Sequence, residues 1–247
     1  MKTYRVDLHV HTLLSPCAEV EMIPPLIVQE ALEQGIDLIA ITDHNASANI
    51  EAVQLAAAGT ELTVLPGIEL QTREEVHSLC LFDTLDQINA LQTWVDGRLP
   101  PLMNNIEYFG EQFVVDQTGD FIRREERLLL ASADISLEEA CLKVNELGGL
   151  FIPAHVNRKA YGLLEVLGLV PPDLQVAALE ISRHINPPGA ARKFPQIAGY
   201  PLIQNGDVHR LEEFLGSTEL TMEHPVIEEI SLALRGIAGR AAKNRFS

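Results

Sequence analysis

Short apolar runs of strand-forming residues alternate with helical patterns along most of this 247-residue chain. This alternation restricts the fold more than any other feature, because it is typical of α/β proteins with parallel strands. The strand-like runs are Tyr4–Val10, Leu38–Thr42, Leu62–Leu70, Val76–Phe82, Leu150–Ala154, Leu179–Ile181 and Leu202–Asn205. The pattern therefore predicts an α/β fold with seven strands.

The segment from residue 84 to 133 interrupts the alternation. Two consecutive prolines follow Leu99, and the run FVVDQTGDFI predicts a β-hairpin that turns at 117–119. We interpret the segment as an insertion within a single domain spanning residues 1–247. It serves either as a cover for the flank of the fold or as a lid, and we favour the cover.

The first predicted strand carries unusual polar residues. Side chains alternate between the two faces of a strand, so Asp7, His9 and His11 lie on one face and the apolar residues at positions 6, 8 and 10 on the other. Imidazole is the commonest ligand for transition metals. The histidine pair therefore raises the possibility of a metal site.

Further polar residues recur where the predicted strands end. They are Asp43, His44, Glu69, His155, Arg158, Asp207, His209 and Arg210, with His77 and Glu180 inside strands. Open and closed α/β sheets build their active sites at these carboxyl ends. His77 is an exception because it comes early in its run, so that strand is antiparallel or its boundary is misplaced.

Six of the eight histidines belong to this set, together with Glu69 and Asp207. So many ligands exceed the needs of one tetrahedral ion and predict two or three divalent ions bridged by a carboxylate or hydroxide. Mixed nitrogen and oxygen ligands suit zinc, iron or manganese better than magnesium or calcium.

Composition limits the partners and the compartment. The net charge of −17 argues against extended nucleic acid as a partner and leaves a small phosphorylated substrate as the expectation. No run approaches the roughly 18 apolar residues of a membrane span. Three widely spaced cysteines argue against a disulfide framework and favour a cytoplasmic location. The oligomeric state stays open.

Four separated motifs, DLHVHT, TDHN, AHVNR and GDVH, together with the lone Glu69, resemble the PHP (polymerase and histidinol phosphatase) superfamily of metal-dependent phosphoesterases. The resemblance extends from Asp7 to about Gly216. It implies a distorted seven-stranded (β/α)7 TIM-like barrel, which agrees with the seven predicted strands. It also implies a trinuclear metal centre.

The family pattern assigns the ligands to three ions. It implies a first ion held by His9, His11, Glu69 and Asp207, a second by Glu69, His77 and His155, and a third by His44, His209 and one residue of the loop after the first strand. That loop reads SPCAE, with Pro16 where many members have Asp. Cys17 is our first candidate for the missing ligand, Glu19 the second, and a water with no protein ligand the third.

The expected reaction is hydrolysis of a phosphomonoester on a small metabolite or nucleotide by a metal-activated water. The residues expected to carry the reaction are His9, Asp207, His209 and Arg158. The residues expected to bind substrate are Arg158, Arg183, His184 and Arg210. Asp7 and Asp43 are candidates for accepting hydrogen bonds from the ligating imidazoles, and the role of Glu180 is open.

Two alternatives remain. The first is a 3′–5′ exonuclease or oligonucleotidase, since related PHP domains of polymerases trim DNA ends. The second is a non-catalytic metal-binding regulatory module. Every expected ligand position outside the loop carries a standard ligand, which argues against the second alternative.

Overall fold

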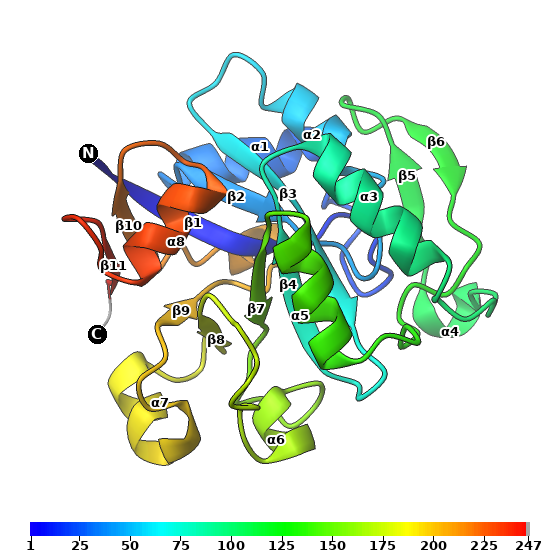
Figure 1. The fold of residues 1–247 in the computed structure, drawn as a ribbon. Coiled ribbons are helices and arrows are strands. Elements are labelled where there is room, and N and C mark those ends of the chain that lie inside the picture. Colours follow the sequence, from blue (N-terminus) through cyan, green and yellow to red (C-terminus); the bar gives the residue numbers. More distant parts are fainter. Residues whose placement is uncertain (246–247) are drawn as a thin grey trace.

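A computed structural model describes residues 1–245 and contains a curled seven-stranded sheet with helices on both sides (Figure 1). Its strands are β1 (Lys2–Val10), β2 (Leu38–Ile41), β3 (Thr63–Gln71), β4 (His77–Leu81), β7 (Leu150–Pro153), β10 (Thr218–Met222) and β11 (Ala241–Asn244). Their order across the sheet is β11-β10-β1-β2-β3-β4-β7. The α/β class predicted from the sequence is confirmed.

Strand directions explain the unusual position of His77. β1, β2 and β3 are parallel, but β4 pairs antiparallel with both β3 and β7. In this register His77 lies opposite Gln71, two residues after Glu69. An early position in an antiparallel strand thus reaches the same edge of the sheet as the carboxyl ends of its parallel neighbours.

The seven-stranded sheet is curled but open, so the distorted TIM-like barrel implied by the resemblance is confirmed only in part. β8 (Leu179–Ile181) and β9 (Leu202–Gln204) pair with each other as a separate two-stranded sheet. An isolated parallel bridge between Val10 and Val208 connects the end of β1 to the loop after β9. β8 and β9 are only three residues long, so they offer few backbone groups for a continuous ladder with the strands beside them.

Helices cover the sheet on both sides. The helices of residues 1–245 are α1 (Pro24–Glu33), α2 (Ile50–Ala56), α3 (Leu85–Asp96), α4 (Ile106–Phe109), α5 (Leu137–Glu146), α6 (Leu163–Leu167), α7 (Pro187–Lys193) and α8 (Ile227–Leu234), although α4 belongs to the 84–133 segment and has no buried residue. A capping box of Ser136 and Glu139 starts α5. One apolar cluster packs α1, α2, α3 and α5 on the sheet, and a second packs α8 on the other side. No helix among residues 1–245 is long and apolar enough to cross a membrane.

The first strand departs from simple alternation. Val6 and Leu8 pack in the cluster beneath α8, but Val10 packs in the opposite cluster. The register between β1 and β2 shifts between Asp7 and Val10. A bulge of this kind re-aims the side chains that follow it, so the prediction of one shared face for the three apolar residues is wrong.

The segment 84–133 contains α3, α4 and the hairpin of β5 (Phe113–Val115) and β6 (Phe121–Arg124), which confirms the predicted hairpin. It packs against the loop that follows β1. Phe113 donates a backbone hydrogen bond to the Leu13 carbonyl. The buried Asn49 side chain donates to the Phe113 carbonyl and accepts from the Val115 N–H.

Candidate metal centre

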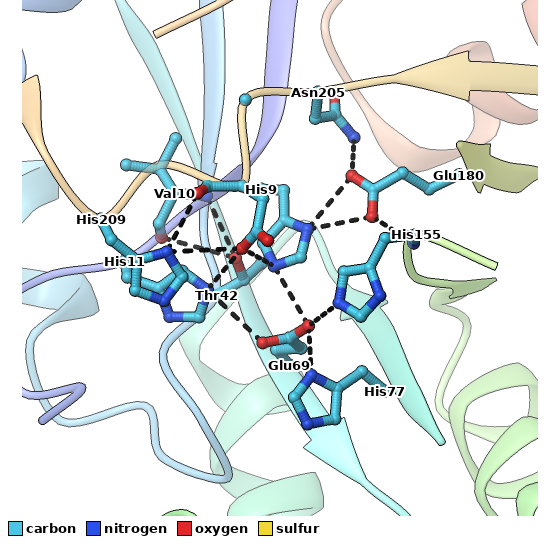
Figure 2. Close-up of polar contacts among 12 residues, drawn as sticks. His9, Val10, His11, Thr42, Glu69, His77, His155, Glu180, Asn205 and His209 are labelled. Carbon is cyan, nitrogen blue, oxygen red and sulfur yellow. Dashed lines mark hydrogen bonds and ion pairs between the residues drawn. The ribbon is translucent and has the colours of Figure 1, made fainter. Parts of the chain in front are cut away.

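Glu69, near the end of β3, lies among buried imidazoles. Its Oε1 lies 2.9 Å from His77 Nδ1, 3.1 Å from His155 Nε2 and 3.3 Å from His9 Nε2. Figure 2 shows these three rings directed toward the carboxylate. The strands β1, β3 and β4 and the loop after β7 therefore bring four predicted ligands to one point.

The second oxygen of Glu69 faces two further imidazoles. Oε2 lies 2.9 Å from His44 Nδ1, just after β2, and 3.4 Å from His11 Nε2. The ring of His209, from the loop after β9, stacks on that of His11 with centroids 4.0 Å apart. The structure thus gathers all six histidines of the predicted set around one carboxylate.

Asp207 closes the centre from the loop after β9. Its Oδ1 lies 3.3 Å from His9 Nε2 and 3.6 Å from His11 Nε2, and its Oδ2 accepts a 2.5 Å hydrogen bond from Arg158. Asp207 has φ of +50° and His155 has φ of +30°. Such left-handed backbone is strained for residues with a Cβ, and it concentrates at functional sites.

Glu180 on β8 fixes the orientation of His9. It accepts a hydrogen bond from His9 Nδ1 at 3.0 Å, and others from the His155 backbone N–H and the Asn205 side chain, both at 2.8 Å. An ionised carboxylate only accepts, so Nδ1 carries a proton and Nε2 is the ligand atom that faces Glu69. This contact supplies the role that the sequence left open for Glu180.

Two other rings are oriented by residues that the sequence did not single out. His11 Nδ1 lies 2.9 Å from Ser15 Oγ, which donates at 2.7 Å to Asp43. His77 Nε2 lies 3.1 Å from Gln71 Oε1. Asp43 therefore reaches an imidazole only through Ser15, not directly as expected. The one available sequence signal for Gln71 is its place two residues after Glu69 on the same strand.

Asp7 does not contact an imidazole, which corrects its expected role. Its buried carboxylate accepts backbone N–H groups from Gly206, Leu215 and Gly216 at 2.9–3.1 Å. Because Gly206 directly precedes Asp207, this carboxylate anchors the start of the loop that carries Asp207 and His209.

Burial and charge compete in the protonation of the centre. Burial raises the pKa of Glu69, but His77, His9 and His44 outweigh it and hold that pKa well below the usual value. Burial lowers the pKa of His9, but Glu180, Glu69 and Asp207 raise it well above normal. For His77 burial prevails and lowers its pKa to about 4. The centre therefore holds ionised carboxylates beside imidazoles of unequal basicity.

The donor set fits divalent cations. The ligand atoms of three overlapping groups lie within 4.8 Å of one another: His9–His11–Glu69, His11–His44–His209 and His44–Glu69–His77. Among residues 1–245, the buried atoms His9 Nε2, His11 Nε2, His44 Nδ1 and Glu69 Oε2 have no hydrogen-bond partner. Buried polar atoms without partners are costly, and a cation would satisfy all four.

The two candidates for a further ligand in the loop after β1, Cys17 and Glu19, have different surroundings. Cys17 is exposed and belongs to none of the three groups, but it lines the same cavity as His44 and His209. Desolvation raises the pKa of its thiol, yet these two imidazoles outweigh that effect and bring it to about 6. Glu19 instead forms an ion pair with Arg210 at 3.0 Å.

Two cavities, of about 390 and 220 Å³, open onto the centre. Both are lined by Cys17, His155, Arg158, Asp207 and His209, so they form one trough across it. The larger cavity also contains Arg183, His184 and Arg210. All four predicted substrate-binding residues thus line the larger cavity.

This fold and this group of histidines and carboxylates define a metal-binding α/β protein. The chain belongs to the PHP domain family, whose model matches residues 7–149. It is 25% identical to the uncharacterised protein YqxK of Bacillus subtilis, an alignment that covers 96% of this chain and 63% of YqxK. It is also 35% identical to the 5′-3′ exoribonuclease Rnm of Salmonella typhimurium, over 30% of this chain and 25% of Rnm.

Among solved structures, the chain is similar to the lesion-specific endonuclease Q of Pyrococcus furiosus. The TM-score is 0.74 at 21% identity, over 98% of this chain and 58% of the endonuclease chain. A complex of endonuclease Q with a 27-mer duplex substrate that has an abasic lesion gives a TM-score of 0.71 at 21% identity. This chain therefore spans less than two thirds of each of these proteins.

The family and the α/β class of fold are thus those that the sequence predicts. The expectation of a small phosphorylated substrate instead of extended nucleic acid is contradicted, because the similar endonuclease Q takes a 27-mer duplex as its substrate. Net charge misled here because it averages over the whole surface. It hides the arginines gathered at the trough.

Proposed function

We propose that this protein is a metal-dependent nuclease that hydrolyses phosphodiester bonds of nucleic acid at the Glu69 centre. The observation that carries the proposal is the trough, whose lining includes three arginines and also His44 and Glu69, each with a buried ligand atom that has no hydrogen-bond partner among residues 1–245. The names of the relatives, an exoribonuclease and an endonuclease, support a nucleic-acid substrate.

The contacts around Glu69 support two ion positions, with the ligands that the family resemblance implies. His9, His11, Glu69 and Asp207 would hold one ion, and Glu69, His77 and His155 a second. When bound, such ions supply Lewis-acid stabilisation of the phosphate and lower the pKa of an attacking water.

The chain's own residues position the substrate. Arg158 lies beside Asp207 at the centre, where its guanidinium binds oxygens of the scissile phosphate. Arg183 donates only to the backbone carbonyls of Gly206 and Glu213, so no carboxylate neutralises it among the described contacts. It is therefore free to pair with a neighbouring phosphate of the strand.

The charge distribution predicts weak dependence on salt. At most three arginines can each neutralise one phosphate, because Arg158 and Arg210 already pair with Asp207 and Glu19, while the rest of a chain with net charge −17 repels the polymer. A binding constant that rests on about three contacts falls with log salt at a slope of about −2 for single strands and about −3 for duplex.

The test is cleavage of end-labelled DNA and RNA, as single strands, as duplexes and as duplexes with an abasic site, in the presence of Mn²⁺ or Zn²⁺. We expect metal-dependent cleavage of at least one class, abolished by EDTA and by His9→Ala. His224→Ala is the matched control, because His224 is exposed and lines neither cavity at the centre.

The result that would overturn the proposal is phosphate release from small phosphomonoesters with no cleavage of any nucleic acid. Cleavage that survives in His9→Ala would overturn it as well, since the activity would then come from a contaminant or another site.

A further inference from the structure

Tyr161 lies in the loop between β7 and α6, beside the metal centre. Its ring stacks on that of His77, with centroids 4.3 Å apart and planes inclined by 6°. The His77 backbone N–H also donates a hydrogen bond to the Tyr161 carbonyl at 3.1 Å. Tyr161 is nevertheless 40% exposed, and it lines the cavity of about 220 Å³ at the centre. His77 therefore covers one face of a ring that also borders the space open to substrate.

The backbone that presents this ring is strained. Tyr161 has φ of +59°, a left-handed conformation that is unfavourable for a bulky side chain. The next residue has no room for a side chain, because a Cβ on Gly162 would overlap the carbonyl oxygen of Arg158. Strain of this kind persists where surrounding contacts enforce it, and it concentrates at ligand-binding sites. The tight turn places Tyr161 and Arg158 in the lining of the same cavity.

Orientation of His77 does not by itself account for Tyr161. His77 Nδ1 lies 2.9 Å from Glu69 Oε1, and its Nε2 lies 3.1 Å from Gln71 Oε1, so contacts at both nitrogens already fix the ring. A ring that served only to orient His77 would not need to border the cavity. Tyr161 does so, and it is the only Phe, Tyr or Trp side chain among residues 1–245 that lines either cavity.

We propose that Tyr161 is a stacking platform for a nucleobase next to the scissile phosphate of the substrate strand. Proteins that bind single strands combine basic side chains, which contact the phosphates, with aromatic side chains on which bases stack. Here Arg158 supplies the first contact and Tyr161 the second, from one loop and in one cavity.

This inference rests on the proposed function in that the substrate is a nucleotide strand. It adds a base contact to the phosphate contacts of the arginines. Every base has an aromatic face, so the platform tolerates different sequences. It favours single-stranded or locally unpaired substrate, because only an unstacked base is free to pack against a side chain.

Substitution of the ring tests the platform in the cleavage assay. Tyr161→Leu keeps an apolar side chain but removes the aromatic face, so we expect kcat/KM for a short single-stranded oligonucleotide to fall about 5- to 150-fold. Tyr161→Phe keeps the ring and should lose far less. Tyr108→Leu is the matched control, because Tyr108 is 79% exposed and lines neither cavity. An unchanged kcat/KM in Tyr161→Leu would overturn the proposal.

Removal of the base separates stacking from an effect on His77. Cleavage at one bond, resolved by electrophoresis, is compared for the intact oligonucleotide and for two versions with an abasic residue on the 5′ or the 3′ side of that bond. If Tyr161 stacks on a base, the wild type and Tyr161→Leu should cleave one abasic version equally well. A ring that only orients His77 would give the same fold loss on all three substrates, and that result would overturn the proposal.

Photocross-linking detects the contact without cleavage. When 5-iodouracil in a single strand is irradiated in the near ultraviolet, it bonds to an aromatic side chain stacked on it, with loss of hydrogen iodide. We expect the peptide cross-linked in the Mn²⁺-loaded protein, identified by mass spectrometry, to contain Tyr161. This cross-link should be absent from Tyr161→Leu and retained in Tyr108→Leu. No cross-link, or cross-links only at other residues, would overturn the proposal.

These readouts fail separately from the nuclease assay. A cross-link at Tyr161 without cleavage of any nucleic acid would leave the stacking platform standing and overturn the proposed function. Cleavage with no cross-link at Tyr161, and with an equal loss on all three substrates, would overturn the platform and leave the nuclease standing.

Discussion

Strand β1 connects two regions that satisfy buried polar groups in opposite ways. At its start it pairs with β10 through five consecutive residue pairs, and the carboxylate of Asp7 accepts three backbone N–H groups. At its end, His9 and His11 present buried nitrogens that have no hydrogen-bond partner among residues 1–245. In the first region the buried polar groups find their partners within the protein. In the second region the buried nitrogens need a bound ligand as their partner.

Asp7 and Glu69 express the same difference in two buried carboxylates. Asp7 is surrounded by donors fixed in the backbone, whereas Glu69 is surrounded by imidazoles whose other nitrogens are held by Glu180, Ser15 and Gln71. A buried acid is therefore not evidence of function by its burial. What distinguishes a functional one is that its neighbours are oriented by further residues and still lack partners.

The largest expected effect on activity comes from removing the charge of Glu69 in the metal centre. Glu69→Gln keeps the side-chain volume but removes a carboxylate that faces both ion positions. We expect nuclease activity to fall about 1,000-fold or more, because metal catalysis supplies several kcal/mol. The metal-induced rise in melting temperature should also disappear. Glu61→Gln is the control, because Glu61 is exposed. Full activity in Glu69→Gln would show that Glu69, like Asp7, has no role in metal binding.

At the start of β1, where Asp7 lies, a substitution should change the stability of the protein. Asp7→Ala leaves three buried N–H donors without their acceptor, so we expect a loss of about 3 kcal/mol or more in the free energy of unfolding. Urea unfolding of the metal-free protein measures this loss. The free energy of unfolding of Asp7→Asn should lie between those of the wild type and Asp7→Ala. Wild-type stability in Asp7→Ala, combined with lost metal binding, would place Asp7 in the metal centre instead.

The sequence could predict the members of the centre because strand periodicity and element order determine which residues meet at one edge of a sheet. His44, Glu69 and Asp207 are separated widely in the chain, yet each follows or ends a strand. The direction of β4 and the bulge that redirects Val10 depend on pairing between strands, which local periodicity does not encode.

The hydrogen-bond partners of the imidazoles were harder to predict for a different reason. Ser15 and Gln71 are ordinary polar residues whose importance depends on distances to His11 and His77. Nucleic acid remained only the alternative substrate in the sequence analysis because net charge is a sum, and the arginines near the trough are a small, local part of it.

A smaller effect should come from Glu180, which orients His9 without lying among the ligands facing Glu69. Glu180→Gln retains an acceptor but no longer holds the charge that favours a proton on His9 Nδ1. We expect metal affinity or activity to fall about 10- to 100-fold, measured by metal titration and initial rates. Restoration of the rate at saturating metal would assign the loss to affinity. An unchanged metal affinity and rate would show that the tautomer of His9 is fixed by other contacts.

The smallest effect should come from a fully satisfied pair far from the centre. Glu229 on α8 accepts two hydrogen bonds from Arg240, at 2.7 and 3.0 Å, and one from the Glu223 N–H. These hydrogen bonds, those from Arg240 with the larger effect, lower the pKa of Glu229 to about 2. A depressed folded-state pKa stabilises the protein above the ordinary glutamate value and loses that stabilisation as pH falls toward 2. Glu229→Gln should therefore lower the melting temperature at pH 7 by at most about 4 °C. The difference should shrink steadily below pH 5, with nuclease activity unchanged at pH 7. A difference that grows toward low pH would mean that this region, too, depends on something other than its own paired groups.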